Sequence, residues 1–340
     1  MLKKDLLREP IEHIDITGFD PIGLIESMSR MSFSARELAS AAMIFDRMVS
    51  DPGCTIVLSL AGSTSAAGCM AVYSDLIRYN MVDAVVSTGA SIVDMDFFEA
   101  LGFRHYKGGT HIDDTVLRNA YVDRIYDTFI DENELQECDS TVKKIADTLR
   151  PGAYSSRQFI AEMGKYLVSN AKKKNSLIQC AYENKVPIFC PAFSDSSAGF
   201  GLVQHQTERP TEHVSIDSVK DFRELTHVKI NSSETGLLII GGGVPKNFIQ
   251  DVVICAEVLG REVPMHKYAI QITVADVRDG ACSSSTLKEA RSWGKVESGS
   301  DQMVFCEGTI AVPLLAGYAY HRGNWKNRAR RNLADLFQAS

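Results

Sequence analysis

The residues best suited to chemistry in this sequence stand in one segment, residues 279–295, which supplies a carboxylate, an indole and a primary amine. A lysine acts as a nucleophile only as the neutral amine, which desolvation favours. Trp293 next to Gly294 offers an apolar wall and close access to Lys295. Two other interpretations stay open. A Gly-Lys pair is typical of a solvated surface lysine, and Thr286-Leu-Lys-Glu289 also fits a capping box at a helix start.

Small and acidic residues follow six apolar runs and form a second candidate site, at residues 61–65, 87–91, 194–197, 241–243, 279–280 and 307–308. At the carboxyl ends of parallel strands such loops meet above the sheet, where helix N-termini present free N–H groups to anions. As a set they predict nucleotide binding, although each loop alone is typical of ordinary turns. No GxGxxG or GxxxxGK[ST] motif follows the first run, so the pattern does not identify the nucleotide.

The elements that must position these residues are apolar strands alternating with helices. Continuous apolar runs, typical of strands buried on both faces, occur at 55–62, 83–89, 186–193, 236–243, 268–275 and 302–306. Helical stretches lie between them, among others at 35–49, 68–79, 156–172 and 244–259. The alternation predicts a doubly wound α/β fold, Rossmann-like, with a mostly parallel sheet and helices on both faces. We expect one catalytic domain over residues 35–340, preceded by an N-terminal extension over residues 1–34.

Composition excludes several classes of protein. The net charge of -7 argues against a nucleic-acid partner, and we expect the basic residues between 322 and 331 to form the solvated face of a closing helix. No apolar run is long enough for a signal peptide or a membrane span, so we expect a cytoplasmic protein. The eight cysteines form no CxxC pair, and His111 with Asp113 and Asp114 fits a polar loop better than a metal site.

Five segments, in the same order along the chain, resemble deoxyhypusine synthases. The most specific is 279–295, where Glu-Ala-x-Ser-Trp-Gly-Lys follows an Asp-Gly and a Ser-rich turn; the others are 80–88, 188–197, 240–246 and 312–315. The resemblance extends from about residue 35 to the C-terminus. Ser-Trp-Gly-Lys combined with an upstream triple glycine is improbable by chance.

The resemblance implies an NAD-dependent enzyme that transfers an aminobutyl group from a polyamine to an acceptor amine through an imine on Lys295. NAD would accept a hydride from the donor and return it to the product. Glu289 would bind substrate or relay a proton, and Trp293 would line the amine tunnel, where its ring face favours a cation. A homotetramer with shared active sites is also implied.

By the same resemblance, the NAD-binding positions are loop residues at the strand ends. Glycines would let the backbone touch the pyrophosphate, and carboxylates would accept hydrogen bonds from ribose hydroxyls. The matching residues are Thr88, Gly89, Asp94, Asp195, Gly241, Gly242, Gly243, Asp279, Ser283, Glu307 and Gly308.

Three positions depart from the family pattern. Asn247 replaces a catalytic histidine, and an amide orients substrate but does not exchange protons near neutral pH. Phe200 and Cys282 replace carboxylates that hold the polyamine, and a buried ammonium without partners costs several kcal/mol. We therefore expect a changed donor or donor orientation. Asp251, four residues after Asn247 on the same helix face, is a candidate replacement charge, and Cys282 is either a reactive thiol or, more typically, a core thiol.

Three functions are consistent with these residues. The first is aminobutyl transfer between small free amines, as in homospermidine synthases, because the chemical core is retained while the spermidine contacts change. The second is deoxyhypusine synthesis on a translation-factor lysine. The third is a catalytically silent protein that binds NAD or an amine on the same scaffold.

Overall fold

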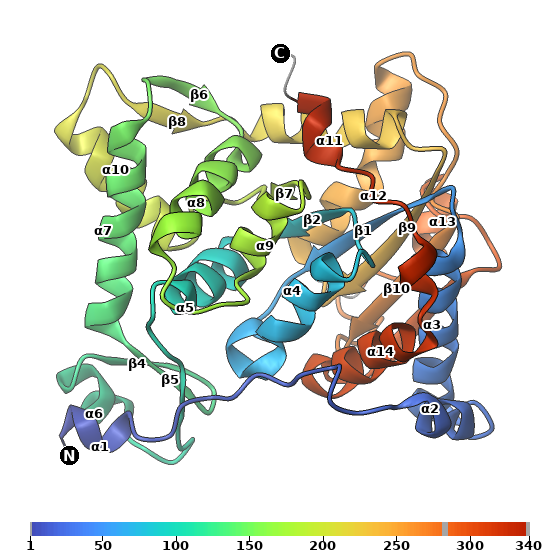
Figure 1. The fold of residues 1–340 in the computed structure, drawn as a ribbon, viewed down its shortest axis with the longest axis horizontal. Helices are drawn as coiled ribbons and strands as arrows, with labels where there is room; N and C mark the ends of the chain where they lie inside the picture. The colour runs from blue at the N-terminus through green and yellow to red at the C-terminus, as the bar shows by residue number, and fades with distance from the viewer. Residues whose placement is uncertain (1, 281–284, 338–340) are drawn as a thin grey trace.

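Six parallel strands form the centre of the protein, whose computed structural model describes residues 2–280 and 285–337 (Figure 1). Their order is β7-β2-β1-β9-β10-β11, so the chain starts in the middle, builds one half and then the other. This is the strand order 3-2-1-4-5-6 of dinucleotide-binding folds, with its switch point between β1 and β9. The predicted fold class is confirmed. The strands are β1 (Cys54–Leu60), β2 (Ala84–Ser87), β7 (Ile188–Phe189), β9 (Glu234–Ile240), β10 (Tyr268–Thr273) and β11 (Asp301–Phe305).

Strand β1 shows why its run is apolar throughout. Its alternate residues face two different cores: Leu58 belongs to the larger core and Val57 to the smaller one on the other face. In the sheet Leu58 pairs with Val85 on one side and with Leu238 on the other. Burial on both faces leaves no position for a polar alternation.

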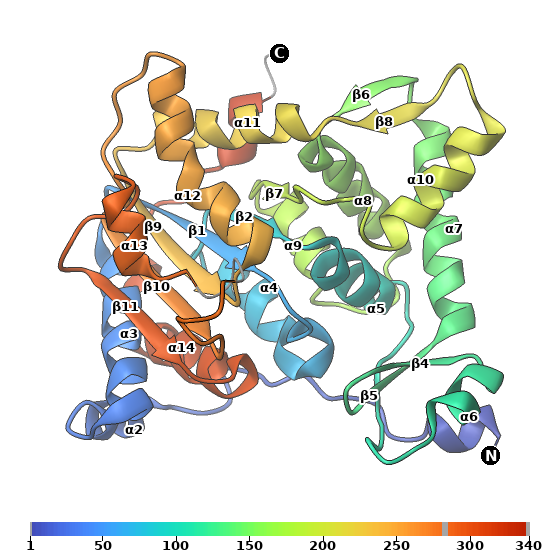
Figure 2. The same ribbon diagram turned by 180° about the vertical axis from the view of Figure 1, so that it is seen from behind.

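Helices cover both faces (Figure 2). The larger core includes α3 (Phe33–Ser50), α4 (Met70–Arg78), α8 (Ser156–Asn170), α9 (Leu177–Glu183) and α14 (Gly308–Arg322). The smaller core includes α11 (Ser218–Ile230), α12 (Gly243–Val258) and α13 (Leu287–Ser292). Each of the four predicted helices is present, with ends within two residues of the observed ones. Among the described residues, no helix has the length and apolar character that crossing a bilayer requires.

Smaller elements complete the chain. One three-stranded sheet has the order β3-β5-β4 and one two-stranded sheet pairs β6 with β8. The strands are β3 (Tyr106–Lys107), β4 (Val122–Ile125), β5 (Thr128–Asp131), β6 (Gly152–Tyr154) and β8 (Val214–Ile216); the helices are α1 (Lys3–Leu6), α2 (Ile22–Met28), α5 (Phe98–Ala100), α6 (Asp114–Asn119), α7 (Glu132–Thr148) and α10 (Ser197–Glu208).

The N-terminal residues run along the body of the protein (Figure 1). Ile16 and Ile25 are fully buried in the larger core, and the Ile11 amide donates to the His105 carbonyl at 2.8 Å. The division between an extension over residues 1–34 and a catalytic domain stays a prediction.

The prediction of a closing helix that carries the basic residues between 322 and 331 is wrong. α14 ends at Arg322, and the chain continues only as short 3₁₀ turns at Asn324–Asn327 and Leu333–Phe337. Arg328, expected on a solvated face, is 3% exposed and pairs with the buried carboxylate of Asp83. Its guanidinium also donates to the carbonyls of Asn80 at 3.0 Å and Cys54 at 2.9 Å. A guanidinium with five donors can join several acceptors at once, which fastens the tail to the amino ends of the strands.

Candidate active site

The strand-end loops predicted to bind a nucleotide lie at one edge of the sheet. The Thr88 amide donates to the Leu60 carbonyl at 3.0 Å, and the Ala61 amide donates to the Ile240 carbonyl at 3.1 Å. The Gly241 amide in turn donates to the Ile272 carbonyl at 2.8 Å. These bonds place the ends of β2, β1, β9 and β10 side by side around the switch point, where ligands bind in this fold.

The triple glycine forms the turn from β9 into α12. Gly241 has φ +76° and lies so close to β1 that a Cβ there would stand 3.1 Å from the Ala61 carbonyl oxygen. Gly243 has φ +66°, and no atom of the described part of the chain lies within 4 Å of where its Cβ would be. Gly242 is the N-cap of α12, and no side chain of residues 2–280 or 285–337 caps the helix start. An uncapped helix start beside open space fits a pyrophosphate.

Two predicted carboxylates are already bonded to the protein. Asp94 accepts from the Ser197 amide at 2.6 Å, and burial raises the pKa of Asp94 to about 6. Glu307 caps α14 by accepting from the Thr309 amide at 2.8 Å. Either side chain would have to share or exchange these bonds to hold a ribose, so their cofactor roles stay predictions.

The remaining predicted cofactor residues lie on the same edge. Gly89 follows β2 and contacts the loop after β7, where Asp195 lies, since a Cβ on Gly89 would be 2.5 Å from Ser196 Oγ. Asp279 follows β10. Gly308 begins α14, and a Cβ there would be 3.0 Å from Thr64 Cγ2 in the loop after β1. Close approaches of this kind explain small residues at these positions.

Lys295 follows α13 and is sheltered. Its side chain is 16% exposed, and its Nζ lies 2.5 Å from Asp251 Oδ1 and 5.2 Å from the centroid of the Trp293 ring. The Lys295 carbonyl accepts from the His266 amide at 2.9 Å, which anchors the backbone beside the start of β10. An indole face and a carboxylate thus hold one primary amine, as the chemistry of an amine site requires.

Helix α12 connects the two halves of the site. Gly243, Asn247 and Asp251 recur at intervals of four residues and so share one face of the helix. At 1.5 Å of rise per residue, the Lys295 amine lies on the order of 12 Å along the helix from Gly243. Asn247 lies between them, one turn before Asp251. The candidate site therefore extends along the outer face of α12, from the dinucleotide edge to Lys295.

Both roles considered for Glu289 are compatible with its geometry. The capping box is confirmed: Thr286 Oγ1 accepts from the Glu289 amide at 3.1 Å, and the Glu289 carboxylate accepts from the Thr286 amide. This bond lowers the pKa of Glu289, which is exposed and therefore ionised near neutral pH. Glu289 lies three residues before the end of α13, and its ionised carboxylate can also hold an ammonium. Trp293, which ends α13, is 67% exposed.

Other predicted residues are not brought to Lys295 in a single chain. Phe200 is 65% exposed on α10, which lies at the opposite end of the molecule from α13 in both ribbon views (Figures 1 and 2). Cys282 and Ser283 lie outside the described residues. Asp113 caps α6, and Asp114 pairs with Arg124 at 2.7 Å. Within residues 2–280 and 285–337, no group of three or more His, Cys, Asp or Glu side chains is arranged to hold a metal ion.

Lys246 is a site residue that the sequence did not reveal. It is fully buried in the first turn of α12 and donates to the Ser285 carbonyl at 2.9 Å and to the Ser285 hydroxyl at 2.5 Å. It thereby ties the start of α12 to the turn that precedes α13. Its place directly after Gly-Gly-Gly-Val-Pro was the available signal, but a lysine at a helix start is usually solvated.

Comparison with known proteins places the chain in a family. The family model for deoxyhypusine synthase matches residues 23–319. A "Deoxyhypusine synthase-like protein" of Coxiella burnetii is 64% identical over 99% of this chain and 96% of the relative. A "Probable deoxyhypusine synthase 2" of Methanosarcina mazei is 39% identical over 96% of this chain and 93% of the relative.

Solved structures agree at the level of the fold. A protein from Entamoeba histolytica described as a candidate deoxyhypusine synthase superposes with TM-score 0.61 at 20% identity, covering 92% of this chain and 97% of that one. The family resemblance inferred from residues 279–295 and the triple glycine thus extends over nearly the whole sequence. The chain belongs to the deoxyhypusine synthase family.

Proposed function

We propose that the protein transfers an aminobutyl group between small free amines, using NAD and a covalent imine on Lys295. The observation that carries the proposal is the setting of the Lys295 amine, which lies over an indole ring and 2.5 Å from Asp251, a carboxylate on the helix that starts at the triple glycine. Membership of a transferase family supports the reaction type.

The strand-end residues fit NAD. Gly241 to Gly243 would receive the pyrophosphate at the uncapped start of α12, where the open space at Gly243 leaves room for it. Thr88, Gly89, Asp195, Asp279 and the Glu307–Gly308 turn would surround the remainder, since they share that edge of the sheet. Bound NAD would supply acceptance of a hydride from the donor and its return to the product.

Lys295 would then perform the transfer. The ammonium first gives a proton to Asp251, whose oxygen lies within hydrogen-bonding distance. The neutral amine attacks the oxidised carbon of the donor, a C–N bond to Lys295 Nζ forms, the bond from that carbon to the donor nitrogen breaks, and the donor amine leaves. Attack by the acceptor amine reverses these steps and frees Lys295. Asn247, one turn from Asp251, would orient the substrate.

The preference for small amines is supported by the charges that remain. Asp251 pairs with Lys295 and Glu289 lies on the helix that precedes Lys295, whereas position 200 carries an exposed phenylalanine. With fewer carboxylates to fix a long polyamine, a diamine such as putrescine is the better match as acceptor. The uncovered faces of Trp293 and Phe200 also support a homotetramer in which a second copy completes each site.

Product analysis tests the proposal. Purified protein is incubated with NAD and putrescine, with or without spermidine, and the amines are identified by mass spectrometry. A new polyamine containing an added aminobutyl group is expected. Absence of any new polyamine, together with modification of a co-incubated translation-factor precursor, would replace the proposal with protein-lysine transfer.

A further inference from the structure

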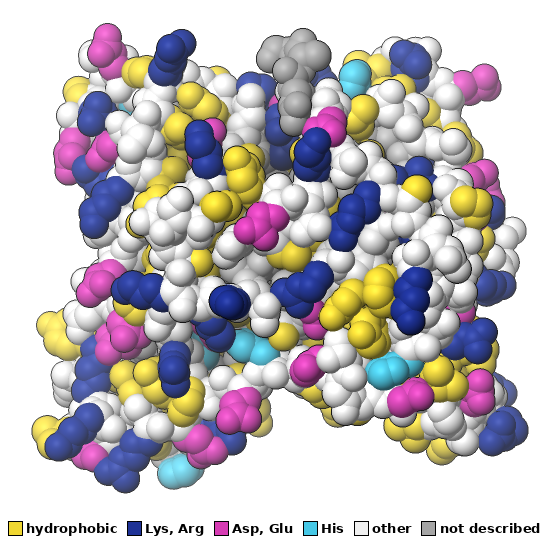
Figure 3. Space-filling view, in the orientation of Figure 1, with side chains coloured by type: hydrophobic (Ala, Val, Ile, Leu, Met, Phe, Trp, Pro, Cys, Tyr) yellow, Lys and Arg dark blue, Asp and Glu magenta, His cyan; other side chains and the backbone are white. Residues whose placement is uncertain are grey.

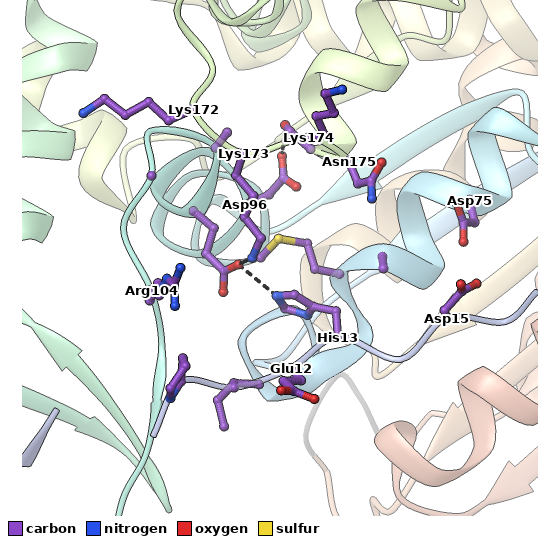
Figure 4. A pocket seen from close by; sticks show the side chains of 18 of the residues that line it. Glu12, His13, Asp15, Asp75, Asp96, Arg104, Lys172, Lys173, Lys174 and Asn175 are labelled. Atoms are coloured by element: carbon purple, nitrogen blue, oxygen red, sulfur yellow. Dashed lines mark hydrogen bonds and ion pairs between the residues drawn. The ribbon is translucent and has the colours of Figure 1, made fainter. Parts of the chain in front are cut away.

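A cavity of about 760 Å³ lies away from Lys295, on the opposite face of the sheet. Its walls are the N-terminal segment over residues 10–17, helix α4, residues 99–104 and residues 172–176 (Figure 4). In the space-filling view this face is hollowed near the N-terminal segment, with basic, acidic and histidine side chains at the rim (Figure 3). The volume is in the range of pockets that hold small metabolites.

A buried carboxylate forms the floor of the cavity. Glu99 is 1% exposed and accepts hydrogen bonds from His13 Nε2 at 2.8 Å and from His105 Nδ1 at 2.7 Å, and Lys173 also pairs with it. Although burial opposes ionisation, the bonds from His105 and His13 hold the pKa of Glu99 well below its usual range. Burying an ionised carboxylate costs free energy, which the three partners of Glu99 offset. Glu99 is therefore a fixed feature of the site and not a chance surface charge.

One side of the cavity has surplus positive charge. Beyond Lys173, it carries Arg104, Lys172 and Lys174, and none of these three pairs with an acid among the described residues. Arg104 lies on the opposite side of His13 from Asp15 in Figure 4, whereas the Lys172 side chain extends outward at the rim. A guanidinium and amines around a concave surface favour a carboxylate or phosphate group.

The other side is acidic. Asp15 and Asp75 lie together across the cavity from Arg104 (Figure 4). Asp75 is 5% exposed, and burial raises its pKa to about 6 against the pairing with Arg78, while Asp15 adds repulsion. Asp15 accepts from the Thr17 amide and hydroxyl through Oδ1, and Arg78 pairs with Asp75, so the two carboxylates near one cation keep a net negative charge that favours an ammonium. Perturbed acids in a cleft that the proposed reaction does not use are a sign of a further binding site.

From this arrangement we infer that the cavity is a second small-molecule site, which binds a zwitterion with its anionic group toward Arg104 and its ammonium toward Asp15 and Asp75. The ligand would touch the N-terminal segment through His13 and Asp15, and so would fasten that segment to α4. The inference is independent of NAD and of Lys295.

Isothermal titration calorimetry on the full-length protein tests the site with simple probes. The zwitterions are 4-aminobutanoate and phosphoethanolamine; acetate and inorganic phosphate provide the anion alone, and ethylamine provides the cation alone. We expect saturable binding of a zwitterion that exceeds binding of either single-charge probe. Arg104→Gln and Asp15→Asn, both at exposed positions, should each weaken it about tenfold or more.

Lys144→Gln is the matched control, because it removes one exposed charge on α7 outside the cavity and should leave binding unchanged. Lys295→Ala should also bind the zwitterion normally, which separates this site from the proposed active site. Equal binding of phosphate and phosphoethanolamine, insensitivity to Asp15→Asn, or no saturable binding by any zwitterion would each overturn the inference.

Discussion

Replacing Asp251 by asparagine tests how Lys295 becomes a nucleophile, because the change keeps the side-chain size and removes one charge. The pair is 2.5 Å long, but 42% of the Asp251 side chain is exposed, so solvent screens it. An exposed ion pair contributes at most about 1 kcal/mol, which corresponds to roughly a fivefold change. Loss of a positioned proton acceptor instead slows a reaction by about 10²- to 10⁴-fold. The two roles of Asp251 therefore predict different magnitudes.

We expect Asp251→Asn to slow borohydride-dependent trapping of a donor-derived adduct on Lys295 by about 100-fold or more. NAD affinity, measured by fluorescence titration, should stay unchanged. Asp114→Asn is the matched control, since it breaks a 2.7 Å pair with Arg124 far from the site and should have no effect on trapping. A loss of fivefold or less would refute the role of Asp251 as proton acceptor.

Three further changes probe the cofactor edge and the fold. Gly243→Ala should weaken NAD binding at least about tenfold, because it places a methyl group in the open space at the helix start. Gly260→Ala is the control, since Gly260 also has positive φ and no described atom within 4 Å of its Cβ position, and it should leave NAD binding unchanged. Equal effects of the two changes would argue against a pyrophosphate at Gly243. Arg328→Met should lower the free energy of unfolding in urea by about 3–5 kcal/mol because it removes the closer and more buried of the two arginines that pair with the buried carboxylate of Asp83. Arg331→Met, which removes the more exposed arginine at 3.7 Å, should lower it by less than about 1 kcal/mol. Burial raises the pKa of Asp96 from 3.8 to about 6, so its contribution to stability is complete below pH 4 and is lost as pH rises through 6. The free energy of unfolding of wild type relative to Asp96→Asn should therefore fall by roughly 2 kcal/mol from pH 4 to pH 7, and a difference independent of pH would contradict this.

Much of the sheet was predictable, because strands buried on both faces leave continuous apolar runs. β1 and β9 follow such runs, and the alternating helices implied a parallel arrangement. β7 contains only Ile188–Phe189, although the apolar run there covers residues 186–193. Prolines at positions 187 and 191 lack the N–H groups that a longer ladder needs.

Parts of the site depend on contacts that spacing does not encode. The Asp251–Lys295 pair joins α12 to the residues that follow α13, and only the four-residue spacing from Asn247 pointed to Asp251. The cluster on Glu99 was not predictable, because His13 and His105 reach it from separate segments. The charges of the tail around Arg328 fit the solvated face of a helix. The structure instead buries Arg328 against the carboxylate of Asp83, a contact that the local sequence does not indicate.

The proposed reaction depends on a covalent bond between Lys295 and the transferred group. The most direct measurement is mass spectrometry of peptides from protein incubated with NAD and putrescine or spermidine and then reduced with borohydride. We expect one aminobutyl adduct, on Lys295, that requires both NAD and the amine and is absent in Lys295→Arg. An unmodified Lys295 in protein that demonstrably binds NAD and produces a new polyamine would contradict it.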